Sequence, residues 1–205
     1  MLLGVGDNML AGIMGRIGEQ FVAAASITAT TQRLSVLFIS SIAFSSCFMI
    51  GQALDEGKLD DVKKQGYTFF VLGILIGAVA AGVIQILKMP MISMYQITEE
   101  TKLMTMELMN AISIIVVFRA TNSMLTKGVL RGGCDARFLM CADILFLWII
   151  AIPFGYVAGL VWKLSPFWVY FCLYSDQIFK AVWCIFRLRS GKWIKPIYGA
   201  GKQEI

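Results

Sequence analysis

Long apolar runs alternate with short polar segments along the whole chain. The run over residues 66–87 contains no charged residue, and as a helix it is long enough to cross a hydrocarbon core of about 30 Å. Similar runs predict helices over residues 21–53, 104–126, 138–162 and 167–188. A shorter run over residues 1–14 gives a helix of only about 21 Å, so it is either re-entrant or the later part of a span, and we favour the second interpretation. The pattern predicts an all-α membrane protein, a six-helix bundle whose first helix is truncated.

The segments between these runs differ in character. Residues 55–65 (DEGKLDDVKKQ) predict a polar loop or a surface helix, and residues 88–102 predict a connector. Glycines punctuate residues 130–138 (LRGGCDARF), which predicts a turn. Pro153 predicts a kink, because proline removes one backbone hydrogen bond from a helix. We take residues 1–196 as one transmembrane unit and residues 197–205 as a flexible cytoplasmic tail.

Composition supports a membrane protein and argues against several other classes. Hydrophobic residues make up 58% of the chain and charged residues 15%, whereas soluble domains carry about 25% charged residues. The chain has no histidine, and its five cysteines form no Cys-x-x-Cys pair, so we expect no metal site and no cofactor. Nothing in the sequence resembles a nucleophile–base pair or a phosphate-binding loop, so we expect no enzymatic activity. The basic residues lie between and after apolar runs, which is typical of membrane topology rather than of a nucleic-acid partner.

Basic residues gather on alternate loops. One side of the predicted bundle carries Lys58, Lys63, Lys64, Lys127, Arg131, Arg137, Arg187, Arg189, Lys192, Lys195 and Lys202, whereas the other side carries Arg16, Lys88, Lys102 and Lys163. An excess of Lys and Arg marks cytoplasmic loops. The distribution therefore predicts a multi-pass protein of the plasma (inner) membrane with a cytoplasmic C-terminus.

Several charged residues fall inside the predicted spans, where they are costly and usually pair or face a cavity. Helical depth places Arg119 and Asp143 at a similar level on consecutive helices, so we hypothesise an ion pair between them. Asp176 and Lys180 are four residues apart, a spacing at which opposite charges on one helix meet, and they predict a structural intramembrane pair. Asp7 has no basic residue within a turn, which makes it a candidate proton or cation site.

The fourth predicted helix carries a polar face. Arg119, Asn122, Ser123 and Thr126 fall within an arc of about 100° on a helical wheel. Two interpretations remain open for this face. It either holds the bundle together through interhelical hydrogen bonds or forms a polar wall of a solute pathway.

Four segments together resemble the multidrug and toxic compound extrusion (MATE) family of transporters. They occur in the family's order as GDNMLAGIMGRIGEQFVAAASI (residues 6–27), LRGGCDARF (130–138), DILFLWIIAIPF (143–154) and FRLRSGKWIK (186–195). The resemblance covers residues 4–196 and is closest to the C-terminal six-helix lobe of a two-lobe transporter, entered inside its seventh span. It implies the family's arginine-glycine-glycine turn at Arg131, Gly132 and Gly133, with its aspartate at Asp135. Cys134 stands where glycine is usual, a departure that we expect to cost little.

The resemblance implies secondary antiport, in which a drug-like, often cationic organic compound leaves the cell as Na⁺ or H⁺ enters. Two lobes would rock around a central cavity, so the implied partners are the lipid bilayer, the organic compound, and either an N-terminal lobe or a second copy of this chain. The candidate cavity or cation-coupling residues are Asp7, Arg119, Asn122 and Asp143. Asp7 departs from the family pattern, because many second lobes have asparagine or another small polar residue there.

Other functions remain open at the level of the sequence. The chain is alternatively a non-transporting truncated fragment, or a half-size subunit that must pair with another lobe. A flippase for lipid-linked sugars is a further alternative, for which we expect a larger cationic cavity.

Overall fold

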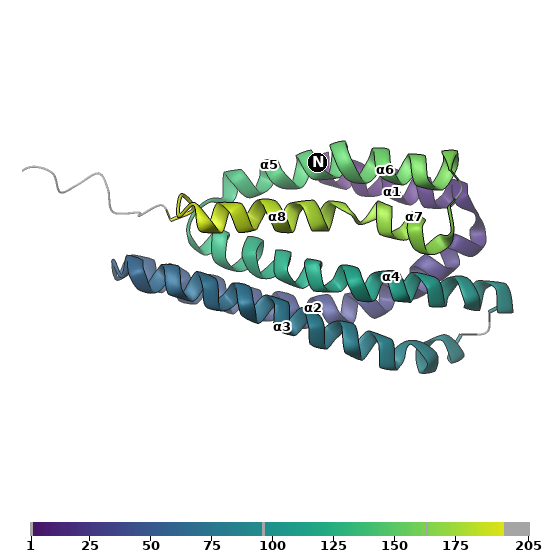
Figure 1. The fold of residues 1–205 in the computed structure, drawn as a ribbon, viewed down its shortest axis with the longest axis horizontal. Helices are drawn as coiled ribbons and strands as arrows, with labels where there is room; N and C mark the ends of the chain where they lie inside the picture. Colours follow the sequence, from purple (N-terminus) through teal and green to yellow (C-terminus); the bar gives the residue numbers. More distant parts are fainter. Residues whose placement is uncertain (1, 96, 163, 195–205) are drawn as a thin grey trace, which may run out of the picture.

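The computed structural model describes residues 2–95, 97–162 and 164–194, with side chains described except at positions 2, 3, 7, 34, 136 and 137. All regular structure within these residues is helical. The first half of the chain forms α1 (Leu2–Ile17), α2 (Glu19–Asp55), α3 (Leu59–Ser93) and α4 (Glu99–Ser123) (Figure 1).

The second half contains interrupted helices. A π-helical segment, η1 (Met124–Leu130), extends α4 without a break. The next pass alternates between α and π geometry through α5 (Ala136–Phe146), η2 (Leu147–Ala151), α6 (Ile152–Tyr156) and η3 (Val157–Val161). The last pass consists of α7 (Pro166–Leu173) and α8 (Asp176–Arg189). The irregularity expected at Pro153 is therefore present, since π turns lie on both sides of it.

The predicted fold class is confirmed. Six helical passes run back and forth through the described part of the chain (Figure 1). Four continuous helical stretches are long and apolar enough to cross a membrane, namely residues 19–55, 59–93, 99–130 and 138–161. The first pass is short, and the last is divided between α7 and α8.

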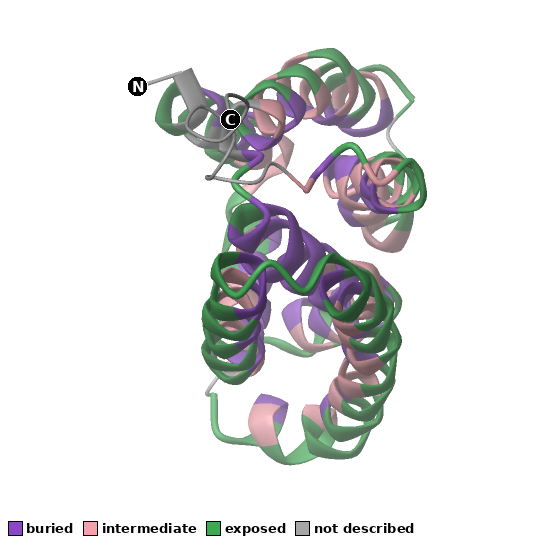
Figure 2. Cartoon of the chain, turned by 90° about the vertical axis from the view of Figure 1, so that its left-hand side faces the viewer, coloured by how far each residue is buried: buried purple, intermediate pink, exposed green. Residues whose placement is uncertain are grey.

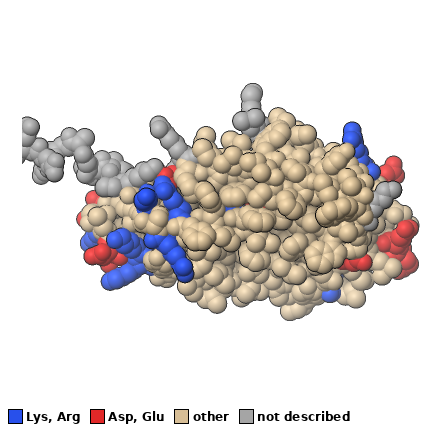
Figure 3. All heavy atoms as spheres, turned by 45° about the horizontal axis from the view of Figure 1, so that its top comes forward, with Lys and Arg blue, Asp and Glu red and all other residues tan. Residues whose placement is uncertain are grey.

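Two boundaries differ from the sequence prediction. The polar segment after α2 shrinks to a turn, because α3 begins at Leu59 and incorporates the charged residues as its first turns. At its other end α3 continues through Pro90 to Ser93, where a connector was expected. A helix tolerates these polar residues because they lie at the ends of the bundle, beside the apolar segment rather than within it (Figure 3).

The helix formed by α4 and η1 lies at the centre of the molecule. Half of its most apolar window is buried, compared with 24% for α2 and 17% for α3. It contacts α2 and α3 on one side and α7 and α8 on the other (Figure 1), while α1 packs on α6 and η3. Buried residues lie mainly where the helices face one another (Figure 2). Side chains on the central helix therefore face most of the other helices.

The outer surface of the bundle is apolar. Phe38, Phe48 and Ile86 expose about three quarters of their surface or more (75%, 74% and 76%). Charged side chains gather at the two ends, with an apolar belt between them (Figure 3). Water penalises such a belt, whereas lipid solvates it, so the structure is that of an integral membrane protein.

Candidate functional site

A polar cleft lies beside the central helix. One cavity of about 200 Å³ is lined by Val36, Ile39, Arg119, Asn122, Ser123, Thr126, Lys127, Gln177 and Lys180. A second cavity of about 380 Å³ shares Thr126, Lys127 and Lys180 with the first and adds Arg131, Leu139, Met140 and Asp143. We call the two together the polar cleft. It runs between α2, α4–η1, α5 and α8.

The polar face predicted on the fourth helix is part of this cleft. Arg119, Asn122, Ser123 and Thr126 all line the same cavity, as the helical periodicity indicated. Asn122 also joins helices, because its Nδ2 donates to the backbone carbonyl of Gln177 at 2.6 Å. The wall of a cavity and the interhelical bond thus coexist on one face.

Asn122 reaches the point where the sixth pass is broken. A turn at Tyr174 and Ser175 separates α7 from α8, although the sequence predicted a continuous helix over residues 167–188. Asn122 Nδ2 donates to the carbonyl of Gln177, the second residue of α8, and thereby ties the start of α8 to α4 just after the break.

The ion pairs inside the bundle differ from those predicted. Lys180 on α8 donates to the carboxylate of Asp143 on α5, so the prediction that Asp176 pairs with Lys180 is wrong. Asp176 is the first residue of α8 and accepts instead from Gln177 Nε2 at 2.7 Å. Within the described residues no ion pair joins Arg119 to Asp143 either, and Lys180 takes the place expected for the arginine.

The extension of α4 by η1 explains the incorrect Arg119–Asp143 prediction. The depth comparison assumed that the fourth helix ends near Thr126, whereas it continues to Leu130. Arg119 therefore lies about 16 Å from that end of the helix, while Asp143 lies about 10 Å from the start of α5. The two residues are at different levels, and Lys180 is the cation within reach of Asp143.

The glycine turn after η1 has a structural role. Asp135 is 1% exposed and accepts from Arg187 of α8 through Nε and Nη2, both at 2.8 Å. A Cβ atom on Gly133 would lie 2.3 Å from the ring of Trp193, and one on Gly132 would lie 2.9 Å from a backbone oxygen of α2. These contacts require small residues, so the turn holds the ends of α2, η1 and α8 together. Arg131 is exposed and lines the polar cleft.

Cys134 adopts a conformation that suits glycine better than cysteine. Its φ is 65°, and the N–H of Asp135 donates to the carbonyl of Leu130 while that of Cys134 donates to Arg131. This pair of bonds is a Schellman cap, in which the left-handed position is usually glycine. This conformation argues against the expectation that cysteine costs little here, because a side chain in the left-handed region is strained.

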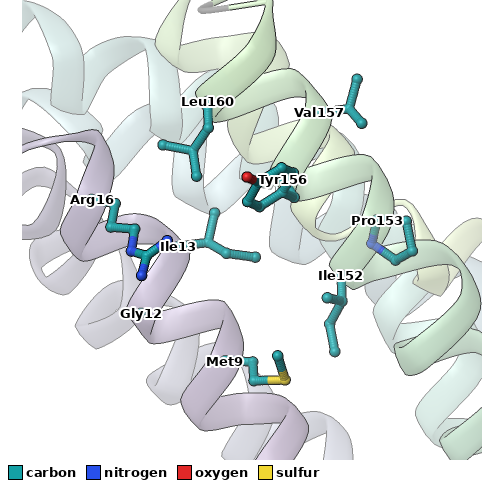
Figure 4. A pocket seen from close by; sticks show the side chains of 9 residues that line it. All are labelled: Met9, Gly12, Ile13, Arg16, Ile152, Pro153, Tyr156, Val157 and Leu160. Atoms are coloured by element: carbon teal, nitrogen blue, oxygen red, sulfur yellow. The ribbon is translucent and has the colours of Figure 1, made fainter.

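A larger cavity of about 490 Å³ lies between α1 and the α6–η3 segment (Figure 4). Its walls are apolar except for Arg16 and Tyr156. A volume of this size is suitable for a drug-sized molecule. Asp7, the predicted lone carboxylate, falls on α1, but its side chain lies outside those that the structure describes.

Sequence reasoning missed three contributors to the polar cleft. Lys127 and Arg131 were assigned to a loop, whereas Lys127 lies on η1 and donates to the hydroxyl of Ser40 at 3.2 Å. Gln177 gave no signal, because only the helix break directs it toward Asn122. Within the described residues no group of three or more histidine, cysteine or acidic side chains is placed to hold a metal ion.

The molecule is thus a helical membrane protein with polar side chains gathered inside it. Comparison with protein families identifies the group more closely, because the profile described as MatE matches residues 2–157. The chain therefore belongs to the MatE family, which confirms the resemblance read from its motifs.

Similar curated proteins carry related names. The probable multidrug resistance protein NorM of Pasteurella multocida is 23% identical over 80% of this chain and 36% of its own length. The multidrug resistance protein MdtK of Photorhabdus laumondii is 25% identical over 80% of this chain and 37% of its own length. The chain spans about a third of the length of these relatives. No solved structure matches the chain significantly.

Proposed function

We propose that this chain is one lobe of a membrane transporter that exports drug-like organic compounds by alternating access, with Na⁺ or H⁺ entering in exchange. The observation that carries the proposal is the polar cleft inside an otherwise apolar bundle. Ionisable residues inside a membrane are expensive and usually belong to a pathway. The names of the relatives, multidrug resistance proteins, agree with export.

Two features of the bundle suit alternating access. The sixth pass is broken beside the cleft, and discontinuous helices mark the binding sites of many secondary transporters. The passes with π turns, η1 and η2–η3, flank the same cleft and the apolar cavity beside α1. Such turns often occur at functional sites, where backbone geometry must change.

The proposed roles follow from the positions of the residues. Arg119 and Asn122 form the cavity wall, and Asp143, held by Lys180, is the carboxylate whose ion pair would rearrange when a cation binds. Asp7 stays a candidate for cation coupling on sequence grounds. The partner in the membrane is a second helical lobe or another copy of the chain. The chain lies in the inner membrane, with its C-terminus on the cytoplasmic side.

The decisive experiment is reconstitution of the chain in proteoliposomes. A Na⁺ or pH gradient is imposed, and efflux of a fluorescent organic compound is followed. We expect gradient-dependent flux that Arg119→Gln and Asp143→Asn reduce, whereas the exposed control Lys64→Met does not. In parallel, cross-linking in the membrane distinguishes pairing of two copies from a single chain. Folded chain that gives no gradient-dependent flux, whether monomeric or paired, would leave the alternative of a non-transporting fragment.

A further inference from the structure

Cations outnumber carboxylates around the polar cleft. Among the described side chains, the first cavity is lined by Arg119, Lys127 and Lys180 and by no acidic residue, and the second adds Arg131 and a single carboxylate, that of Asp143. Asp143 is already paired with Lys180. The described lining therefore holds no second carboxylate to balance the other three cations, Arg119, Lys127 and Arg131.

Groups behind the lining change this balance only in part. Asp176 is close enough to Arg119 for electrostatic interaction, but it is 9% exposed and bonded to Gln177. Lys127 donates to a neutral hydroxyl, that of Ser40, and the charged side chains that act on it include the like charges of Arg119 and Lys180. Even with Asp176 included, four cationic groups and two carboxylates surround the cleft among the side chains that the structure describes.

Such an excess is costly inside a membrane. Insertion scales assign about 2.5–3.5 kcal/mol to each Lys or Arg at the centre of a span. Lys127 is partly buried, and Lys180 exposes only 14% of its side-chain surface. A chain that retains these charges gains most if a ligand of opposite sign enters the cleft.

The chemistry of the donors along the cleft indicates the kind of ligand. Arg119, Lys127 and Arg131 lie along one continuous helix, with about 18 Å between the first and the last. Between them Ser123 Oγ is buried and has no hydrogen-bond partner among the described residues. A guanidinium fork and an ammonium beside a hydroxyl donor match the oxygens of a carboxylate or a phosphate.

We propose that the polar cleft binds an anionic group, a carboxylate or phosphate carried by an organic compound. The proposal rests on the proposed transport function for its physiological meaning and changes its substrate class, because the resemblance alone implied a compound that is often cationic. The ligand sits between η1 and α8, and Asp143 competes with it for Lys180.

Binding to the full chain tests the proposal without any gradient. The protein is placed in nanodiscs of zwitterionic phosphatidylcholine, and citrate, inorganic phosphate and tetraphenylphosphonium are titrated by calorimetry. We expect citrate or phosphate to bind and the cation not to bind. High salt weakens the binding through screening.

Three variants and one control separate charge from fold. Lys127→Met lowers affinity for the anion about tenfold, as expected for the loss of one charge-assisted bond, whereas Lys127→Arg restores it. Asp143→Asn raises affinity, because it releases Lys180. Lys64→Met removes an equal charge from an exposed position on α3, outside the cleft, and leaves affinity unchanged. A merely structural role would make Asp143→Asn and Lys127→Met change binding in the same direction.

Changing the lipid of the nanodisc distinguishes a lipid phosphate from a soluble anion as the ligand. If phosphatidylglycerol in the nanodisc displaces citrate, and Lys127→Met abolishes that competition, then the cleft takes a lipid phosphate. If phosphatidylglycerol has no effect, the cleft takes a soluble anion. Preference for tetraphenylphosphonium, or equal losses in Lys64→Met and Lys127→Met, would overturn the proposal. Anion binding without gradient-driven flux would instead refute the transport function and leave the site intact.

Discussion

Lys180 has two carboxylates close to it in sequence or in space, and the structure pairs it with the more distant one in sequence. Asp176, one turn away on the same helix, lies at the N-terminus of α8, where backbone N–H groups and Gln177 stabilise its charge. Asp143 on α5 lacks such support and receives the lysine. Sequence spacing could not decide this, because the choice depends on where the helix begins.

A double-mutant cycle measures the pair directly. Lys180→Met and Asp143→Leu each lower the free energy of unfolding in detergent, because either change leaves one charge unpaired, and their coupling energy is about 1–3 kcal/mol. The matched cycle of Lys180→Met with Asp176→Leu serves as control, and we expect its coupling to be several times smaller. A larger coupling with Asp176 would restore the pairing read from the sequence.

A substitution at Cys134 is expected to raise the stability of the protein rather than lower it. Replacing it with glycine removes the strain of a left-handed side chain, and we expect Cys134→Gly to raise the free energy of unfolding by about 1 kcal/mol. The same substitution at Cys141, an exposed position inside α5, lowers stability, because glycine weakens a helix interior. Thermal unfolding in detergent measures the stability of both variants. If both are destabilised, Cys134 is not strained.

At the scale of the helices, the sequence predicted where they lie but not where they end. Apolar runs identify the buried or lipid-facing middle of each helix, since hydropathy is strongest there. The ends of α3 are polar and carry charges that also suit a loop, so the residues alone do not place its start at Leu59 or its end at Ser93. The same ambiguity assigned Lys127 to a loop and concealed its place in the polar cleft.

Close packing between α3 and α4 depends on glycine at position 77. A Cβ atom on Gly77 would lie 2.8 Å from the backbone of Val117 on α4, so a side chain there must push the two helices apart. We expect Gly77→Leu to lower the free energy of unfolding by about 1–3 kcal/mol or more. Gly82 lies on the same helix with nothing within 4 Å of its Cβ position, and Gly82→Leu should be nearly neutral. Equal effects at both positions would show that glycine content, rather than contact with α4, sets the stability.

At the scale of the whole molecule, the basic loops predicted from the sequence coincide with one end of the helical bundle. The turns after α2 and after η1 and the end of α8 lie at one end of the bundle, and the connections after α1, α3 and η3 lie at the other (Figure 1). Among the described residues, the basic side predicted from the sequence falls at the first end, because that end holds Lys58, Arg131, Arg187, Arg189 and Lys192. Hydropathy and loop charge alone thus predicted the order of the passes and which connections share one end of the bundle. The polar cleft could not be derived in this way, since it arises from side chains on helices that are distant in sequence.

This charge asymmetry predicts the orientation in the membrane. Positive loops remain in the cytoplasm during insertion, so we expect Lys58, in the turn after α2, to face the cytoplasm and Glu100, at the start of α4, to face outward. Lys58→Cys and Glu100→Cys, made in a chain whose native cysteines are replaced by serine or alanine, are treated with a membrane-impermeant maleimide. In right-side-out vesicles the reagent should label Glu100→Cys, and in inverted vesicles Lys58→Cys. The reverse pattern would place the cationic mouth of the polar cleft, at Arg131, outside the cell, and an anion would then enter the cleft from the exterior.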